Sequence, residues 1–273
     1  MTDQYSVIGN PIAHSKSPMI HGMFAKACSQ DMQYSRLEAA LDGFEDAVDA
    51  FRQAGGKGMN VTSPFKLNAR DYATDLSQAV KLAGAANALK FEGDRVFAEN
   101  FDGVGLVRDV VHNLQTPLKG QRILLMGAGG AVRGALLPIL EEGPKEVVIA
   151  NRSIQKACDL ASIGAPYGRV RSCTYAQLEG LGFDVVFNGT SSSLHGELPP
   201  VPASAFAHCA LAYDMSYGKG LTPFLMLAQR AGAQRLADGV GMLVEQAAQA
   251  FCWWRGVRPD TKDVIKAWTV PLT

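Results

Sequence analysis

The sequence has no excess of charge of either sign. Among its 273 residues, 26 lysines and arginines balance 26 aspartates and glutamates, so the formal net charge at pH 7 is zero. Proteins that act mainly on nucleic acid or on anionic membranes usually carry a basic excess that attracts the polyanion. The balanced composition therefore argues against both partners.

Long apolar runs, a secretory leader and paired cysteines are also missing. No apolar stretch approaches the ~20 residues that span a bilayer, and no basic segment followed by an apolar one opens the chain. The five cysteines form no C-x-x-C pair, and the five histidines show no metal-ligand spacing. We therefore expect a cytoplasmic protein with no metal site and no disulfide framework.

Short strand-like runs alternate with helix-like stretches along the chain. The pattern predicts strands at 5–9, 59–62, 122–126, 146–150, 184–188 and 210–214, and helices at 18–29, 44–54 and 239–256. Ser17 is the expected cap of the first helix, and Gly55 and Gly56 are expected to end the second. Such alternation is typical of an α/β fold with a mostly parallel sheet. The polar stretch 113–121 marks a break between two halves.

A glycine-rich turn follows the predicted strand 122–126 and opens a helix. It consists of Gly127, Ala128, Gly129, Gly130 and Ala131. In a strand–turn–helix unit, such a turn lets backbone N–H groups and the helix N-terminus face the pyrophosphate of a dinucleotide. The motif lacks the usual glycine at its sixth place, so its context supports the prediction more than its letters do. A tight turn without a ligand is the alternative.

The end of the next strand indicates which nicotinamide cofactor is bound. NAD sites usually have an acidic side chain there, which bonds the ribose 2′-hydroxyl. This chain has Asn151 and Arg152, with Lys156 four residues later. A guanidinium bonds a 2′-phosphate that a carboxylate would repel, so we predict NADP. A solvated basic helix start is the alternative reading.

Four short motifs outside this unit are rich in groups that bind hydroxyls and carboxylates. They are HSKSP at 14–18, NVTSPFK at 60–66, AGAAN at 83–87 and NFDG at 100–103, each at the end of a predicted strand or in the loop after it. The carboxyl ends of strands form the binding crevice of open α/β sheets. Taken singly, each motif could be a helix cap or a turn. Together they predict a cleft for a small polyol.

These motifs resemble the shikimate dehydrogenase family over nearly the whole chain. The resemblance rests on NPIAHSKSP, GGKGMNVTSPFK, NFDGVGL, GAGGAVRGALLP, NRS, YDMSY with TPFL, and ADGVGMLVEQA, in the family's order. It implies the reversible, NADPH-dependent reduction of 3-dehydroshikimate to shikimate, on the route to aromatic amino acids. It also implies a substrate-binding and catalytic domain at 1–102 plus 239–273, a Rossmann NADP domain at 103–238, and a cleft between them. A monomer or a homodimer is expected.

The resemblance assigns three groups of site residues. The substrate's carboxylate and hydroxyls would be bound by Ser15, Ser17, Thr62, Asn87, Tyr217 and Gln246. The cofactor would be bound by the glycine turn, by Asn151, Arg152 and Lys156, and also by Met215, Gly239 and Met242. Met242 would lie beside the nicotinamide. The catalytic pair would be Lys66 and Asp102.

The proposed chemistry needs an acid–base group within ~3 Å of the reacting oxygen. A protonated Lys66 could donate to the alkoxide that develops as a ketone is reduced, and Asp102 could hold its ammonium in place. The member of the pair that shuttles the proton stays open, because coupled groups titrate jointly.

Three positions depart from the family pattern. Phe101 and Ala88 each stand where a threonine is usual, and Ser193 and Leu194 follow NGTSS where a glycine is common. If Phe101 has removed a polar contact beside Asp102, the chain is a divergent member with weak shikimate activity or a preference for quinate. If Phe101 instead faces the core, its polar neighbours point the other way and the site is intact. A non-catalytic sensor of NADP and a shikimate-like ligand is a further alternative, which retention of Lys66 and Asp102 disfavours.

Overall fold

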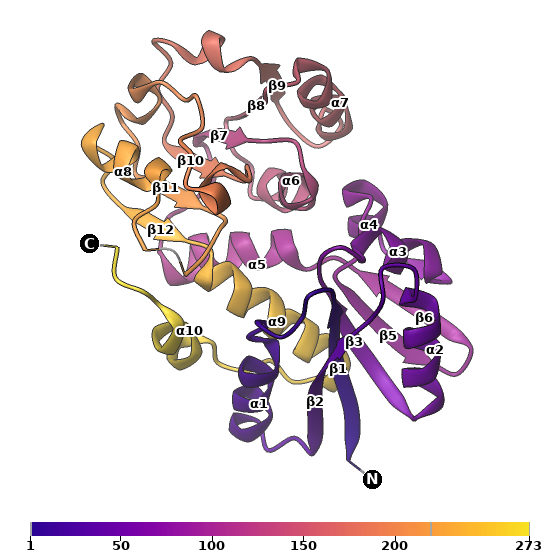
Figure 1. Ribbon diagram of the computed structural model, residues 1–273. Helices are drawn as coiled ribbons and strands as arrows, with labels where there is room; N and C mark the ends of the chain where they lie inside the picture. The colour runs from indigo at the N-terminus through magenta and orange to yellow at the C-terminus, as the bar shows by residue number, and fades with distance from the viewer. Residues whose placement is uncertain (1, 219, 273) are drawn as a thin grey trace. The chain divides into compact units, whose positions relative to one another are not determined.

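The computed structural model describes residues 2–218 and 220–272 and divides the chain into two compact units (Figure 1). The first unit comprises the chain through Gly105 together with Val244–Val264, and the second comprises Leu106–Leu243 and the chain from Ile265. The divisions fall inside the helices α5 (Asp102–Arg108), α9 (Val240–Arg255) and α10 (Lys262–Trp268). Over the described residues, no helix combines the length and the apolar character needed to cross a membrane.

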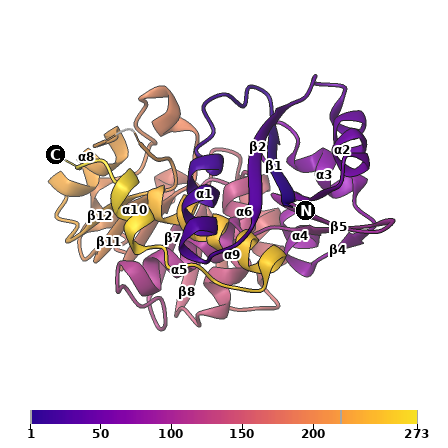
Figure 2. The ribbon, with the colours of Figure 1, turned by 90° about the horizontal axis from the view of Figure 1, so that it is seen from below.

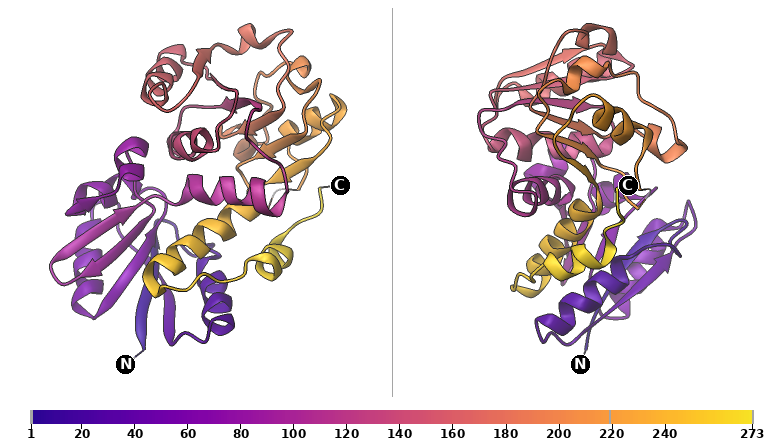
Figure 3. Two further views of the ribbon diagram at one scale, coloured as in Figure 1. Left: turned by 180° about the vertical axis from the view of Figure 1, so that it is seen from behind. Right: turned by 90° about the vertical axis from the view of Figure 1, so that its left-hand side faces the viewer.

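The sheet of the first unit is mixed. Its six strands lie in the order β2-β1-β3-β5-β6-β4, with bounds β1 Asp3–Gly9, β2 Met32–Glu38, β3 Gly56–Val61, β4 Asp75–Leu76, β5 Ala88–Glu92 and β6 Arg95–Glu99. Strand β1 runs parallel to both β2 and β3, whereas β5 runs antiparallel to β3 and β6. The sequence pattern did not predict β5 and β6, which form a hairpin around Gly93 at φ +59° (Figure 3).

Helices cover both faces of this sheet. Helices α2 (Phe44–Gln53), α3 (Lys66–Tyr72) and α4 (Gln78–Ala83) bury one core with the strands, through residues such as Phe44, Phe65 and Val80. Helix α1 (Ser17–Ala27) packs along β2, as Figure 2 shows, and its Phe24 meets Phe251 of α9 at 5.8 Å between ring centroids.

Two predicted helix boundaries in this unit are wrong. Helix α1 begins at Ser17 itself with Lys16 in the cap position, and no side chain caps it, so the hydroxyl of Ser17 is not used to satisfy the helix end. Gly55, at φ +90°, makes the turn after α2, but Gly56 already belongs to β3. The cap was predicted from the Ser-Pro pair alone. Proline is favoured in the first turn of a helix, but it does not determine whether the residue before it is the cap or already part of the helix.

The sheet of the second unit is wholly parallel. Its strands lie in the order β12-β11-β10-β7-β8-β9, with bounds β7 Arg122–Met126, β8 Glu146–Ala150, β9 Val170–Cys173, β10 Val185–Asn188, β11 Leu211–Asp214 and β12 Leu236–Asp238. The helices are α6 (Gly130–Glu141), α7 (Ile154–Gly164) and α8 (Pro223–Arg230), with a short π-helix at Asp109–Asn113 and short 3₁₀-helices at Tyr175–Leu178, Ser192–His195 and Ala203–Phe206. The strand order reverses between β7 and β10, which makes their carboxyl ends the expected ligand crevice.

The apolar run of β7 is explained by burial on both faces. Ile123 and Leu125 belong to the core on one side of the sheet, and Leu124 and Met126 belong to the core on the other. Successive side chains of a strand point to opposite faces, so a strand covered twice needs apolar residues at every position. This confirms the prediction of a doubly buried strand before the glycine turn.

A buried carboxylate fixes the start of α9 within the second unit. Asp109 accepts a hydrogen bond from the hydroxyl of Tyr213 at 2.8 Å, and that hydroxyl accepts one from the backbone N–H of Met242 at 3.2 Å. A Cβ at Gly241 would lie 2.0 Å from Oδ1 of Asp109, so only glycine allows this approach. The contact holds Met242 in a defined position.

Candidate active site

Polar segments gather at one edge of the first sheet because of its topology. The loops after β1 and β3 leave from the same edge, since these strands are parallel. Strand β5 runs the other way, so its amino end, which Asn87 precedes, lies at that edge too. Strand β6 returns, and its carboxyl end carries Asn100 and Asp102 there. The predicted gathering is therefore present, although Asn87 precedes a strand rather than following one.

The side chains of Lys66 and Asp102 form an ion pair. Each is the first residue of its helix, Lys66 of α3 and Asp102 of α5. Nζ of Lys66 lies 2.6 Å from Oδ2 of Asp102, and the two side chains are 35% and 15% exposed. An ammonium has three donors, and this bond uses one of them. The pair is thus partly open, with donors of Lys66 left for a ligand.

The other side of the carboxylate is held by amides. Nδ2 of the buried Asn87 donates to Oδ1 of Asp102 at 2.8 Å and lies 3.4 Å from Oε1 of Gln246. The backbone N–H of Asp102 donates to Oδ1 of Asn100 at 3.1 Å. Lys66, Asp102, Asn87 and Gln246 are therefore brought together, and both oxygens of the carboxylate are bound.

A buried network supports Asn87 from below. Asn60 donates from Nδ2 to the backbone oxygen of Asn87 at 3.3 Å, and its Oδ1 accepts from the hydroxyl of Tyr34 at 2.6 Å. Nε2 of His21 lies 3.1 Å from the same Oδ1, and the His21 ring stacks on Tyr34 with centroids 4.2 Å apart. Burial lowers the pKa of His21 to about 3, so the ring is neutral. His21 and Tyr34 were not predicted, because an apolar helix face and an edge strand gave no sign of a shared partner.

The remaining predicted substrate residues divide between the units. Ser15 and Ser17 lie together, since Oγ of Ser15 accepts from the backbone N–H of Ser17 at 3.3 Å. Thr62 sits against Gly9, where a Cβ would come within 2.6 Å of the threonine methyl group. These three belong to the first unit, whereas Tyr217, 45% exposed, follows β11 in the second.

Phe101 faces the core of the first unit. Its side chain is 7% exposed and packs edge-on against Trp253, with ring centroids 5.6 Å apart. Ala88 and Ala250 belong to the same apolar cluster. Phe101 and Ala88 therefore complement each other inside the fold, and Asp102 keeps its hydrogen bonds to Asn87 and Lys66. The geometry favours the second of the two readings drawn from the sequence.

A hollow of about 270 Å³ opens where the second sheet reverses its order. Five predicted cofactor residues line it: Gly127, Ala128, Gly129, Asn151 and Arg152. Six others were not predicted: Tyr175, Gly189, Thr190, Ser191, Ser192 and Pro200. The sequence held a signal for Gly189, Thr190, Ser191 and Ser192. This polar run follows the buried strand β10, just as the glycine turn follows the buried strand β7.

The hollow fits the phosphates of a dinucleotide. Gly127 has φ +106°, and a Cβ there would lie 3.2 Å from the backbone oxygen of Gly189. At Gly129 and Gly130 a Cβ would meet nothing within 4 Å, so the backbone is open to an incoming group. Helix α6 starts at Gly130 without a side-chain cap, which leaves its first N–H groups for an anion.

The lining favours a phosphorylated ribose. The hollow has a guanidinium, Arg152, and no acidic side chain among its described lining residues. Burial raises the pKa of Tyr175 to about 12, so this neighbour of Arg152 stays an uncharged phenol. Gly130, Ala131 and Lys156 do not line the hollow, and Lys156 is exposed on α7.

Met215, Gly239 and Met242 are not among the residues that line the hollow, but a Cβ at Gly189, which does line it, would lie 3.0 Å from Sδ of Met215. A Cβ at Gly239 would come within 2.3 Å of the backbone oxygen of Met215, so these two segments touch. Asp214, which is fully buried, accepts hydrogen bonds from the hydroxyls of Ser193 and Thr222 at 2.5 and 2.8 Å. The carboxylate thereby ties the loop after β10 to the loop after β11.

Three family sequence profiles match successive parts of the chain. The shikimate dehydrogenase substrate binding domain matches residues 7–89, and shikimate / quinate 5-dehydrogenase matches residues 109–195. The shikimate 5′-dehydrogenase C-terminal domain matches residues 239–267. A shikimate dehydrogenase (NADP(+)) of Nitrosospira multiformis is 57% identical over 265 residues, which cover 97% of this chain and 96% of that protein.

The chain belongs to the shikimate dehydrogenase family. A second relative, the shikimate dehydrogenase (NADP(+)) of Chromobacterium violaceum, is 54% identical and covers 97% of each chain.

Solved structures of the family share the fold. The crystal structure of an Ael1 enzyme from Pseudomonas putida has a TM-score of 0.97 and 58% identity, covering 99% of this chain and 100% of that one. Shikimate 5-dehydrogenase from Thermus thermophilus, in complex with NADP(H) and shikimate, has a TM-score of 0.86 and 28% identity, covering 97% and 98%. The α/β architecture and the Rossmann character of the second sheet are confirmed.

The neutral, buried His21 predicts an acid-sensitive fold. Its pKa is about 3 in the folded chain and about 6.5 when unfolded, so protonation favours unfolding. The stability that His21 contributes is fully present above pH 6.5 and falls by up to about 1.4 kcal/mol per pH unit below it. Urea unfolding at pH 7 and pH 5 should therefore show a loss about 2 kcal/mol larger for the wild type than for His21→Gln. The carboxylates that titrate in this pH range are the same in both proteins, so they contribute equally to the loss of stability. An equal loss of unfolding free energy in the two proteins would therefore contradict a neutral, buried His21.

Proposed function

We propose that the protein is an NADP-dependent shikimate dehydrogenase, which reduces 3-dehydroshikimate reversibly to shikimate in aromatic amino acid biosynthesis. The observation that carries the proposal is the ion pair of Lys66 with Asp102, 2.6 Å long, beside Asn87. The ammonium of Lys66 supplies a transferable proton, and the neighbouring side-chain amides can hydrogen-bond the hydroxyls of a polyol. The two relatives described above are more than 50% identical to this chain, and both are named as NADP(+) shikimate dehydrogenases, which agrees with this activity.

The first unit supplies groups for a hydroxylated ring that carries a carboxylate. Ser15 and Ser17 would bind the carboxylate, and Tyr217 is also assigned to the substrate. Thr62, Asn87 and Gln246 would bond the hydroxyls. The cap position of α1 is Lys16, so the hydroxyl of Ser17 is not spent on the helix end. Asn87 is held by Asn60 and by the backbone N–H of Phe101, which fixes the amide before a ligand arrives.

Lys66 would act on the oxygen that changes between ketone and alcohol. In the direction of reduction its ammonium donates a proton to the developing alkoxide, and in the other direction its amine accepts one. Asp102 holds the ammonium at 2.6 Å and keeps it aimed, while Asn87 occupies the second carboxylate oxygen. Lys66 and Asp102 thus form one acid–base unit.

When bound, NADP supplies the nicotinamide carbon that exchanges a hydride with the substrate. The backbone of Gly127, Ala128 and Gly129 would hold its phosphates, and Asn151 and Arg152 would hold the adenosine ribose with its 2′-phosphate. The proposed cofactor set also includes Gly130 and Ala131 at the start of α6, and Lys156, Met215, Gly239 and Met242.

We assign the first unit as the substrate-binding and catalytic domain and the second as the NADP domain. The expected bounds were 1–102 plus 239–273 for the former and 103–238 for the latter, and the compact units divide at 105/106, 243/244 and 264/265. Because reduced nicotinamide is regenerated inside cells, we propose a cytoplasmic location. We further propose that the enzyme works as a monomer or a homodimer and without nucleic acid.

Lys66→Ala should lower the turnover number by about 10²-fold or more, since it removes the proton donor and acceptor. The cofactor site lies in other residues, so the dissociation constant for NADP should be unchanged. Steady-state oxidation of shikimate, with Lys145→Ala as an exposed-lysine control, measures the effect. Turnover near that of the wild type would exclude Lys66 from the mechanism.

Arg152→Ala should raise the Michaelis constant for NADP about tenfold or more and leave that for NAD nearly unchanged, because a charge-assisted hydrogen bond to the 2′-phosphate is lost. Lys156→Ala is the comparison, since Lys156 does not line the hollow and should have the smaller effect. A wild-type ratio of the two constants in Arg152→Ala would refute the phosphate assignment.

Phe101→Thr should destabilise the protein by about 2–4 kcal/mol, because it removes a ring packed on Trp253. The ratio of kcat/KM for shikimate to that for quinate should stay within about twofold of wild type, since Phe101 faces the core. Denaturant unfolding and steady-state kinetics below the melting temperature test both parts. A rise in shikimate activity would instead favour a divergent enzyme.

A further inference from the structure

A second hollow in the first unit has no part in the proposed reaction. It measures about 220 Å³ and is lined by three cations, three aromatic side chains and one carboxylate: Lys57, Lys90, Arg255, Tyr5, Phe91, Trp254 and Asp3. Its β1 residues, Asp3 and Tyr5, stand at the start of that strand, whereas the substrate loop follows its end at Gly9. Seven residues of strand separate the two places by about 20 Å.

The floor of this hollow is a gap in a row of side chains. Tyr5, Gly58 and Lys90 are register neighbours across β1, β3 and β5. Gly58 contributes no side chain, and a Cβ there would lie 2.6 Å from Nε1 of Trp254. The indole therefore occupies the gap, stacks on Tyr5 at 4.9 Å between centroids and donates to the backbone oxygen of Leu89. Tyr5 and Trp254 thus form an aromatic wall, in which the indole is held by the stacked ring of Tyr5, by the backbone at Gly58 and by the hydrogen bond to Leu89.

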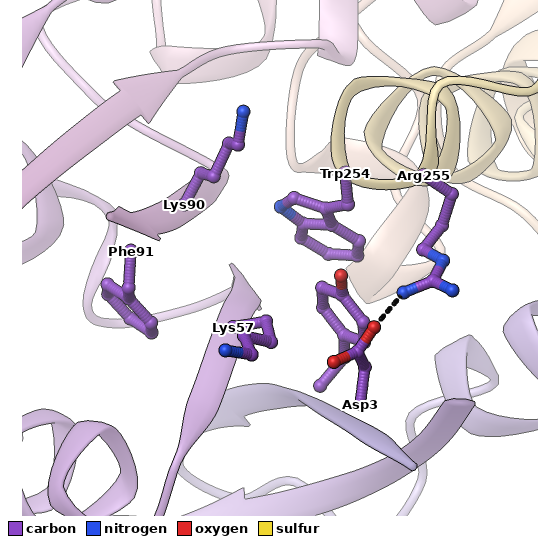
Figure 4. Close-up of a pocket in the computed structure, with 7 residues that line it drawn as sticks. Asp3, Lys57, Lys90, Phe91, Trp254 and Arg255 are labelled. Carbon is purple, nitrogen blue, oxygen red and sulfur yellow. Dashed lines mark hydrogen bonds and ion pairs between the residues drawn. The ribbon is translucent and has the colours of Figure 1, made fainter. Parts of the chain in front are cut away.

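An irregular register places an extra lysine beside this wall. Gln4 pairs with Gly56 and Tyr5 with Gly58, so Lys57 is an extra residue in β3. Such bulges re-aim a side chain that would otherwise alternate with its neighbours. In Figure 4 the side chain of Lys57 lies between those of Phe91 and Trp254.

The charges of the hollow leave one cation unneutralised. Arg255 is paired with Asp3 and also donates to Gln30 at 2.9 Å. Lys90 lies 2.5 Å from the carboxylate of Glu92. Over residues 2–218 and 220–272, the side chain of Lys57 has no hydrogen-bond or ion-pair partner. The site thus offers a single unneutralised positive charge between aromatic groups, which matches one negative charge on a ligand.

We propose that this hollow binds a small monocarboxylate carried on a flat ring. The carboxylate meets the ammonium of Lys57 in a charge-assisted hydrogen bond, and the ring lies against Trp254 and Phe91. The volume is below that of pockets for drug-sized ligands, which matches one ring with its carboxyl group. Binding here is independent of the proposed dehydrogenase activity.

Benzoate is the probe, and its neutral isostere benzamide is the charge control. Titration of the full-length chain is followed through the indole N–H signal of Trp254, assigned with Trp254→Phe. We expect benzoate to shift that signal with a dissociation constant of about 1 mM. Benzamide should bind about tenfold more weakly, because it lacks the charge.

Lys57→Gln is the decisive variant and Lys145→Gln its matched control, since both remove one exposed lysine charge. Lys57→Gln should weaken benzoate binding about tenfold and leave kcat and KM for shikimate unchanged, which also shows that the variant folds. Lys145→Gln should bind as the wild type does. Equal affinity of wild type and Lys57→Gln, equal affinity for benzoate and benzamide, or no shift of the Trp254 signal would each overturn the proposal.

Discussion

The arrangement of the first unit depends on satisfying the carboxylate of Asp102. A partly buried carboxylate is costly unless its oxygens are bound, and here one oxygen takes the ammonium of Lys66 while the other takes the amide of Asn87. Those partners come from separate segments, the start of α3 and the residue before β5. The two hydrogen bonds therefore tie both segments to Asp102, and they leave an ammonium with further donors beside an ordered amide.

Strand direction is what allows these segments to meet. If β5 were parallel to β3, Asn87 would lie at the far edge of the sheet from Lys66. The hairpin of β5 and β6 turns both the entry to β5 and the exit from β6 toward the loops after β1 and β3. The second unit has only parallel strands, so the carboxyl ends of all its strands lie at one edge of the sheet. Gly127 after β7 and Gly189 after β10 therefore meet where the strand order reverses.

Sequence patterns predicted the parts of this structure in which one local signal suffices. The doubly buried β7, the glycine turn after it and the long α9 are examples, because each is encoded within a few adjacent residues. The motifs around Lys66 and Asp102 indicated a site, and a family resemblance supplied the roles. The contacts of His21 and Tyr34 with Asn60 could not be foreseen, since three distant segments share one oxygen atom. The orientation of Phe101 was equally hidden, because it depends on Trp253, far along the chain.

The central claim is that Lys66 and Asp102 work as one acid–base unit. A double-mutant cycle on the turnover number, with Lys66→Met, Asp102→Asn and the combined variant, tests it most directly. If the two side chains act together, the combined variant should be no more than about threefold slower than the slower single variant. Losses that multiply, so that the combined variant is slower by the product of the two single effects, would contradict the account.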